Sequence, residues 1–260
     1  MNSLSYLLEK INIAKELDFG TIFGQAIELF KKTWLQGFLL QLFTVIVMLP
    51  LIIILYIPLI AFAIAEAENG YGGSNVYSDF FAGVSILYIL FLVAGILVLG
   101  AVSVALNAAF FRIMKKMDFN ESVTTSDFFY FLKGKYLSKT FALMLVSILI
   151  AIPSALLCYV PLIYVIVPMS FFVIMFAFNP ELSVGDIVKV SFKLGNKKWL
   201  LAFGLMIISS LVAQIVGLVL CGIGVLFTSA FVYHPVYLIY KDVIGFDDDT
   251  EIQKIGVSSE

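Results

Sequence analysis

Polar and apolar residues recur with a helical period in residues 183–199, which lead directly into a long uncharged run. At about 100° per residue, one side of such a helix is apolar and the other is polar and basic. The apolar side holds Val184, Ile187, Val188, Phe192 and Leu194, and the polar side holds Asp186, Lys189, Lys193, Asn196 and Lys197. Ser183 and Asp186 have the spacing of a capping box, and the indole of Trp199 suits the headgroup level of a bilayer. The pattern predicts a basic amphipathic helix on a membrane surface.

The same pattern occurs twice earlier in the chain, ahead of other uncharged runs. Residues 21–34 form an apolar side and a polar side, and Glu28 and Lys32 stand at the i, i+4 spacing of an ion pair. A weaker copy begins at Thr124, with Asp127 at the position of its capping partner. We therefore expect three basic helices on the cytoplasmic surface, each placed before a membrane hairpin.

The uncharged runs are long enough to supply the membrane-crossing helices, since about 20 apolar residues cross the roughly 30 Å hydrocarbon core. Residues 36–65 and 80–110 form the first predicted hairpin, with bends expected at Pro50 and Pro58. Residues 141–178 form the second, turning near residues 158–161, and residues 200–240 form the third, turning near residues 221–224. The sequence thus predicts an all-α polytopic membrane protein with six transmembrane helices arranged as three hairpins.

Composition and charge agree with this class. Hydrophobic residues make up 62% of the chain and charged residues 13%, against roughly 45–50% and about 25% in soluble domains. The net charge of −2 does not favour a nucleic-acid partner. All 16 Lys and Arg residues fall on the side of the termini, so the positive-inside rule predicts that both termini are cytoplasmic. We expect an N-terminal amphipathic segment over residues 1–17, a six-helix membrane domain over residues 18–245, and a mobile acidic tail over residues 246–260.

Three stretches carry a resemblance to known proteins: residues 18–34, residues 179–199, and the close of the chain with Gly222, Gly224 and residues 237–240. In these stretches the chain resembles bacterial six-helix membrane proteins, namely the membrane domain of glycerophosphoryl diester phosphodiesterases and related stand-alone membrane proteins. The resemblance implies a six-helix fold in a bacterial inner membrane. It implies no catalytic residue, because the soluble phosphodiesterase domain has no counterpart in this chain.

Few residues are candidates for chemistry. Asn107, Asn179 and His234 lie near the inner ends of predicted spans, where they would either line a shared polar pocket or each bond a free helix carbonyl, Pro235 having freed one. Cys158 and Cys221 lie at predicted periplasmic turns, where they would either form a disulfide or fill apolar space. Neither the cysteines nor the single histidine has a metal-ligand spacing, and no cofactor is expected.

The functional expectation follows from the absence of Asp, Glu, Lys and Arg within the predicted spans. Ion-coupled transporters usually hold an ionisable group at membrane depth, and no nucleophilic dyad can be built there. We expect a membrane-embedded scaffold or a lipid- and protein-interaction module with no enzymatic activity; the alternative is an uncoupled facilitator or permease subunit for a small neutral solute. The expected partners are anionic membrane lipids and a protein that the sequence does not identify. The candidate headgroup ligands are Lys31, Lys32, Trp34, Lys189, Lys193, Lys197, Lys198 and Trp199.

Overall fold

The computed structural model describes residues 3–69, 86–157, 159–220 and 222–246, and these are helical with no strand among them. The α-helices are α1 (Leu4–Ile13), α2 (Phe19–Asn69), α4 (Ile86–Asp118), α5 (Gly134–Leu156), α6 (Val160–Phe178), α7 (Val184–Lys197), α8 (Trp199–Val219), α9 (Val225–Thr228) and α10 (Tyr233–Val243), and the 3₁₀ segments are η1 (Thr125–Leu132) and η2 (Ser229–Val232). Three predicted features lie outside the described residues. They are the disulfide between Cys158 and Cys221, the start of the second span, and the acidic tail beyond residue 246.

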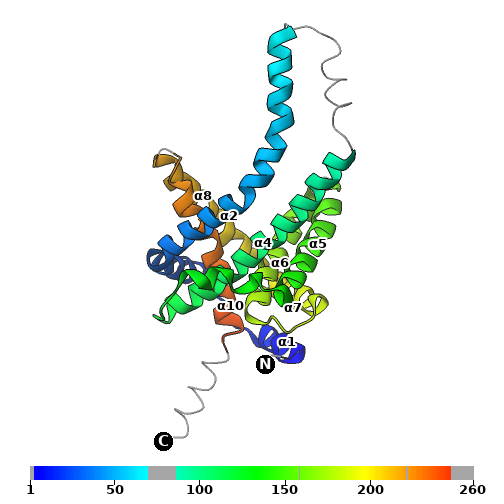
Figure 1. The fold of residues 1–260 in the computed structure, drawn as a ribbon. Coiled ribbons are helices and arrows are strands. Elements are labelled where there is room, and N and C mark those ends of the chain that lie inside the picture. Colours follow the sequence, from blue (N-terminus) through cyan, green and yellow to red (C-terminus); the bar gives the residue numbers. More distant parts are fainter. Residues whose placement is uncertain (1–2, 70–85, 158, 221, 247–260) are drawn as a thin grey trace, which may run out of the picture.

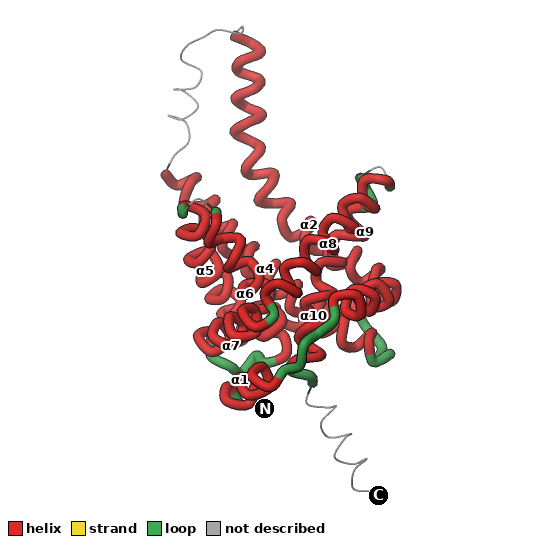
Figure 2. The backbone as a smooth tube through the Cα atoms, turned by 180° about the vertical axis from the view of Figure 1, so that it is seen from behind, coloured by secondary structure: helices red, strands yellow, loops and turns green. Residues whose placement is uncertain are grey.

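Five helices of the described chain are long and apolar enough to cross a membrane: Phe19–Ile57 within α2, Tyr88–Asp118 within α4, and the whole of α5, α6 and α8. The chain is therefore an all-helical, multi-pass membrane protein. Figures 1 and 2 show that α5 and the α8–α9 pair spread apart as they leave the end that carries α1, α7 and α10. We call that end the base.

The first predicted surface helix is not a separate element, so its prediction as one is wrong. Residues 21–34 are the opening of α2, which continues through the uncharged run for 51 residues. Residues 31–36 contain neither proline nor glycine, and the single Gly37 costs a helix only about 1 kcal/mol, so the backbone hydrogen bonds continue. Figure 1 shows that α2 bends, its blue opening lying across the base and its cyan end rising beyond the other helices.

The sixth predicted span is not one continuous helix either. Residues 225–243 are helical throughout but divide into α9, η2 and α10. Pro235 has no N–H to donate to the carbonyl four residues earlier, that of Phe231, and this break in the bonding pattern falls at the junction of η2 and α10. The two predicted turns are where the sequence places them, since α5 ends at Leu156 before α6 begins at Val160, and α8 ends before α9 over residues 220–224.

The two remaining surface segments have the predicted caps but different conformations. At Thr124, the backbone N–H donates to Asp127 Oδ2 at 2.8 Å, but the segment that follows is the 3₁₀ helix η1 rather than an α-helix. At α7, Ser183 Oγ accepts from the N–H of Asp186 at 3.1 Å, as expected for an N-cap.

The apolar side of α7 is partly covered by protein. Ile187, Val190 and Leu194 are fully buried, whereas Val184, Val188 and Phe192 are half-buried. The helix packs against both α6 and α1. The contact with α6 is close, because a Cβ added at Gly195 would lie 2.6 Å from Pro168 Cα. Part of the face predicted to rest on lipid, namely Ile187 and Leu194, thus packs inside the protein.

The core lies near the base, where α4, α6 and α10 meet. Its largest fully buried side chains include Phe110, Phe111, Phe171, Phe176, Tyr237 and Tyr240. Ala101, Ala105 and Ala109 of α4 are buried, as expected for a row of small residues that lets another helix approach. Away from the base, large apolar side chains are exposed, with Leu149 at 70% and Leu218 at 68%. An exposed apolar surface of this kind is what a bilayer would cover.

Candidate functional site

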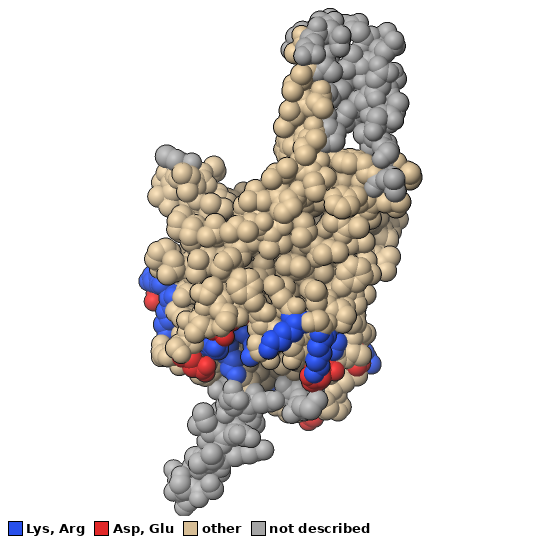
Figure 3. Space-filling model, viewed as in Figure 1, with Lys and Arg blue, Asp and Glu red and all other residues tan. Residues whose placement is uncertain are grey.

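Charged side chains gather at the base. On the face drawn in Figure 3, Lys, Arg, Asp and Glu lie in a belt close to the base, and the surface above this belt carries none among the residues described. Two pockets open within this charged region, one beside α2 and α10 and one beside α6, and α4 contributes its last turns to both. The base is therefore where polar or charged ligands could be held.

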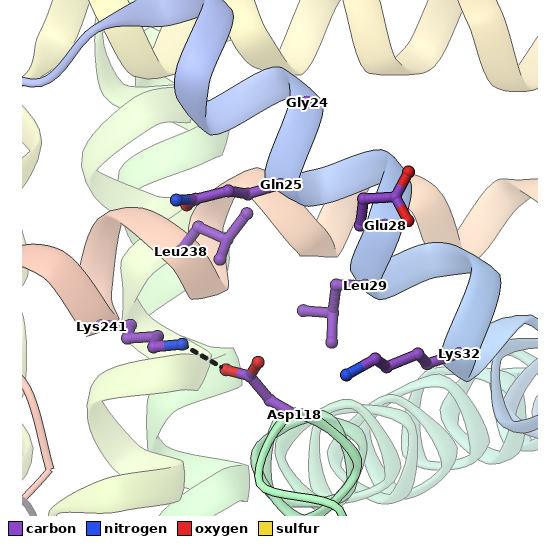
Figure 4. Close-up of a pocket in the computed structure, with 8 residues that line it drawn as sticks. All are labelled: Gly24, Gln25, Glu28, Leu29, Lys32, Asp118, Leu238 and Lys241. Carbon is purple, nitrogen blue, oxygen red and sulfur yellow. Dashed lines mark hydrogen bonds and ion pairs between the residues drawn. The ribbon is translucent and has the colours of Figure 1, made fainter.

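The first pocket, of about 420 Å³, lies between α2, α4 and α10 (Figure 4). Its lining residues are Gly24, Gln25, Glu28, Leu29, Lys32, Asp118, Leu238 and Lys241. Asp118, at the end of α4, accepts from Lys241 Nζ at 2.7 Å and from the Tyr237 hydroxyl at 2.9 Å. These two contacts neutralise the carboxylate and tie α10 to α4, so Asp118 has a structural role in this pocket.

Lys32 is the lysine of this pocket that has no carboxylate partner among the described residues. The sequence predicts a pair between Glu28 and Lys32, but Glu28 instead pairs with Lys31 at 2.6 Å. Both side chains of that pair are largely exposed, at 70% for Glu28 and 63% for Lys31, so the pair contributes little to stability. Figure 4 shows the side chain of Lys32 pointing into the pocket from α2. A lysine in this setting is available to an anion from outside the protein.

The second pocket, of about 340 Å³, lies between the end of α4 and the end of α6. Its lining residues are Arg112, Lys115, Lys116, Glu121, Ala177, Phe178 and Pro180. The guanidinium of Arg112 lies 3.7 Å from the centroid of the Tyr130 ring, and Lys116 Nζ pairs with Asp127 Oδ1 at 2.7 Å. Burial raises the pKa of Asp127, but the hydrogen bonds from Lys116 and Thr124 outweigh it and hold the pKa below its usual value. Asp127 is thus ionised and occupied by Lys116 at neutral pH.

His234 and Thr33 form a buried polar pair between α10 and α2. Both are fully buried, and the Thr33 hydroxyl lies 2.7 Å from His234 Nε2. His234 Nδ1 lies 3.2 Å from the carbonyl oxygens of both Ala230 and Phe231. Two carbonyls facing Nδ1 place the N–H on that nitrogen, so Nε2 is an acceptor. It shares the single Thr33 hydroxyl proton with the Leu29 carbonyl, which lies 3.0 Å from the same hydroxyl oxygen. The expectation that His234 bonds the carbonyl freed by Pro235 is confirmed. The bond between Thr33 and His234 was not predicted, because Thr33 carries no charge and belongs to no motif.

The predicted polar pocket also includes Asn179 and Asn107. Asn179 is buried, and its Nδ2 donates to the Tyr240 hydroxyl at 2.9 Å and to the Met175 carbonyl at 3.2 Å. Asn107 is half-buried on α4. The lining residues of the two pockets at the base include none of Asn107, Asn179 and His234, so a pocket shared by these three remains a prediction.

Of the predicted headgroup ligands on α7, two are engaged by the protein itself. The ammonium groups of Lys197 and Lys198 donate to the backbone carbonyls of Asn12 and Lys15, which follow α1. Lys198 is only 7% exposed, and burial, followed by the neighbouring charge of Lys197, lowers its pKa. Helical spacing alone gives no signal for these bonds, because their acceptors lie far away in the sequence. Lys189 and Lys193 are exposed, as predicted.

The two tryptophans among the predicted headgroup ligands also differ in whether the protein itself occupies them. Trp34 is 46% exposed and lies beside Phe227, with 6.2 Å between ring centroids. Trp199 donates from Nε1 to the Tyr164 carbonyl at 3.0 Å and stacks on Phe203, so its polar atom already has a partner in the protein. Trp34 therefore keeps the partly exposed position that suits a bilayer interface.

The described residues contain no group of three or more His, Cys, Asp and Glu side chains that could hold a metal ion. The described part of the base presents cations, several paired carboxylates and two open pockets. The comparisons assign this multi-pass membrane protein to no narrower class, since no family model, curated protein or solved structure matches it.

Proposed function

We propose that this protein is a membrane-embedded scaffold whose base binds anionic lipid and a protein partner, and that it has no catalytic activity of its own. The observation that carries the proposal is the separation of charge, with ionic groups at the base and uncharged helix surfaces above (Figure 3). A coupled transporter would need an ionisable group at the depth of those surfaces. A scaffold needs only apolar helices that hold it in the membrane and a charged surface that binds its partners.

The proposal places the base on the cytoplasmic side of a bacterial inner membrane. The excess of Lys and Arg at the base supports this orientation through the positive-inside rule. Residues 225–243 would then make a sixth crossing, and at 1.5 Å per residue they span about 28 Å, close to the thickness of the hydrocarbon core. The resemblance to the membrane domain of glycerophosphoryl diester phosphodiesterases belongs to the same proposal.

Exposed lysines supply the attraction to lipid in this proposal. Lys189 and Lys193 on α7 and Lys32 on α2 are exposed, and each such charge contributes about 1 kcal/mol near an anionic surface. Lys197 and Lys198 contribute less, because their ammonium groups are bonded to the N-terminal segment. Part of the apolar side of α7 is buried in protein, so α7 would face the headgroups mainly with its lysines.

The first prediction tests lipid retention. We expect the variant Lys189→Gln with Lys193→Gln to retain at least fivefold less phosphatidylglycerol than the wild-type protein, since each lost lysine removes about 1 kcal/mol and even one such loss lowers an equilibrium constant about fivefold. The measurement is the anionic lipid that co-purifies in mild detergent, quantified by mass spectrometry. Lys189→Arg with Lys193→Arg is the matched control, because it keeps both charges and should retain the wild-type amount.

Undiminished retention in the glutamine variant would count against the scaffold proposal. Passage of a neutral solute such as glycerol into proteoliposomes that contain the wild-type protein would favour an uncoupled facilitator instead. The two assays use the same purified protein, so they decide between the two functions directly.

A further inference from the structure

The N-terminal helix α1 is held at the base by a small apolar contact. Figures 1 and 2 show α1 beside α7, the helix of the described chain against which it packs most extensively. The side chains of Leu7 and Ile11 are fully buried, and the others of α1 are exposed or half-buried. A helix of 10 residues is too short to be stable alone in water, so α1 depends on this docking. We call α1 and residues 14–17, which form no helix, the strap.

Two lysines at the end of α7 bond the C-terminal end of the strap. Lys197 Nζ donates to the Asn12 carbonyl, and Lys198 Nζ donates to the Lys15 carbonyl. Carbonyls in the last turn of a helix have no partner within that helix, and a cation there also interacts favourably with the helix dipole. The two bonds therefore hold both the last turn of α1 and the chain that follows it.

Lys197 belongs to the basic side of α7. Lys189, Lys193 and Lys197 follow one another at spacings of four residues, which places them on one side of the helix. Lys189 and Lys193 are exposed there, whereas the ammonium group of Lys197 is bonded to the strap. The strap thus ends on the side of α7 that, on the proposed function, meets anionic headgroups.

The strap lowers the positive charge that this part of the base offers to a ligand. Among residues 3–17, two Glu offset two Lys, so the strap brings no net charge of its own. Lys198 is only 7% exposed while its bond to the strap is formed. The carboxylate of α7, Asp186, stands at the other end of the helix and accepts from Ser183 Oγ at 2.6 Å. Docking of the strap therefore occupies two of the four lysines at residues 189–198.

Release of the strap would make all four of these lysines available. An anionic membrane surface attracts each nearby lysine, so it binds the released state better than the docked state. A ligand with such a preference shifts the equilibrium toward the state that it binds better. Terminal segments with few buried side chains also open at a lower free energy than the core does. Anionic lipid and the strap thus oppose one another at the end of α7.

We propose that the strap and anionic lipid compete for Lys197 and Lys198, so that the docked strap holds these lysines in reserve and anionic lipid releases it. The inference rests on the proposed function, because it concerns regulation of the same lipid-binding surface. Linkage requires that the strap weakens lipid binding by the same factor as lipid weakens docking of the strap. The competition is non-covalent throughout.

The first test measures hydrogen–deuterium exchange of the wild-type chain in nanodiscs. The discs contain either phosphatidylcholine alone or equal parts of phosphatidylcholine and phosphatidylglycerol. We expect the N–H groups of residues 4–13 to exchange at least about fivefold faster in the anionic discs, a typical size for coupling between two sites. Residues 105–111 of α4 lie in the core and should exchange equally in both. Equal exchange of residues 4–13 in the two kinds of disc would overturn the proposal.

The second test uses two matched variants of α1. Ile11 is fully buried and Ile13 is 70% exposed, so the same replacement by serine loosens the strap only at Ile11. We expect Ile11→Ser to retain at least about threefold more phosphatidylglycerol than the wild-type protein, and Ile13→Ser to stay within about twofold of it. Retention of phosphatidylcholine should not change in either variant. Equal retention of phosphatidylglycerol by the two variants would count against the strap.

The gain in Ile11→Ser must come from the released lysines. Adding Lys197→Gln and Lys198→Gln to this variant should return the retention of phosphatidylglycerol to the wild-type level or below it. A gain that persists in the triple variant would assign it to exposed apolar surface and would refute the competition. The exchange measurement uses the wild-type chain, so it decides the question even where a variant fails to fold.

Failure of the strap and failure of the scaffold give different results. If Lys189→Gln with Lys193→Gln loses lipid but α1 exchanges equally in both discs, the scaffold stands and the strap is wrong. If that variant retains the wild-type amount while anionic discs still speed the exchange of α1, the strap stands and the scaffold proposal fails. In that case Lys197→Gln with Lys198→Gln should abolish the difference between the discs.

Discussion

At the scale of single residues, polar side chains in the apolar interior are satisfied by helix carbonyls and by one another. His234 bonds the carbonyls near Pro235, and Thr33 completes the hydrogen bonding of its ring. At the end of α6, the Asn179 side chain likewise donates a hydrogen bond to the Met175 carbonyl. A donor or acceptor that is buried away from water without a partner raises the free energy of the folded state, and these bonds avoid that cost.

Replacing Thr33 with valine should leave His234 Nε2 buried without a partner. We expect the free energy of unfolding to fall by about 1–3 kcal/mol, measured by denaturation in mixed micelles. Thr44→Val is the matched control on the same helix, because the Thr44 hydroxyl donates to the Leu40 carbonyl at 2.8 Å and to no side chain. Equal losses in the two variants would show that the bond to His234 contributes nothing.

At the scale of elements, α7 shows what a helical pattern leaves open. Its periodicity predicts an apolar side, and that side exists, but α6 and α1 pack against part of it. Periodicity reports that a face is apolar and cannot tell lipid from protein as the surface it meets. Gly195, to which the helical pattern assigns no role, is a point of close approach between α7 and α6.

Adding a methyl group at Gly195 should force the two helices apart. A Cβ there would lie 2.6 Å from Pro168 Cα and 2.9 Å from Pro168 N, both backbone atoms. We expect Gly195→Ala to destabilise the protein by about 1–3 kcal/mol, the usual cost of overpacking, in the same mixed-micelle assay. Gly185→Ala in α7 is the control, because its Cβ would approach Ser183 Oγ no closer than 3.9 Å. It should be neutral or stabilising by up to about 1 kcal/mol, and a similar loss in both variants would refute the close contact.

At the scale of the whole molecule, the charged base and the apolar helices above it define how the protein sits in a bilayer. The helices diverge away from the base, so lipid would reach surfaces that a tighter bundle would cover (Figure 2). The base is held together by contacts between distant parts of the chain, among them the bonds from Asp118 to Lys241 and Tyr237.

The orientation can be tested with single cysteines in a protein whose Cys158 and Cys221 are replaced by serine. Ile223, 67% exposed in the turn between α8 and α9, lies away from the base, and Glu9 is exposed on α1. We expect a membrane-impermeant maleimide to label Ile223→Cys in intact cells and Glu9→Cys only after the cells are opened. Labelling of Glu9→Cys from outside would reverse the orientation, and labelling of both would contradict the proposed number of spans.

The sequence by itself determined the class of the protein, the position of its long apolar helices and the turns between them. These follow from composition, hydrophobic runs and caps such as Ser183, all of which act within a few residues. Only the tertiary structure decided that α2 continues past Trp34, that residues 225–243 divide into three pieces, and that α7 packs against α6. The pocket around Arg112 also required it, since its residues come from helix ends far apart in the chain. Contacts between distant segments leave no periodic signal, so pattern alone cannot place them.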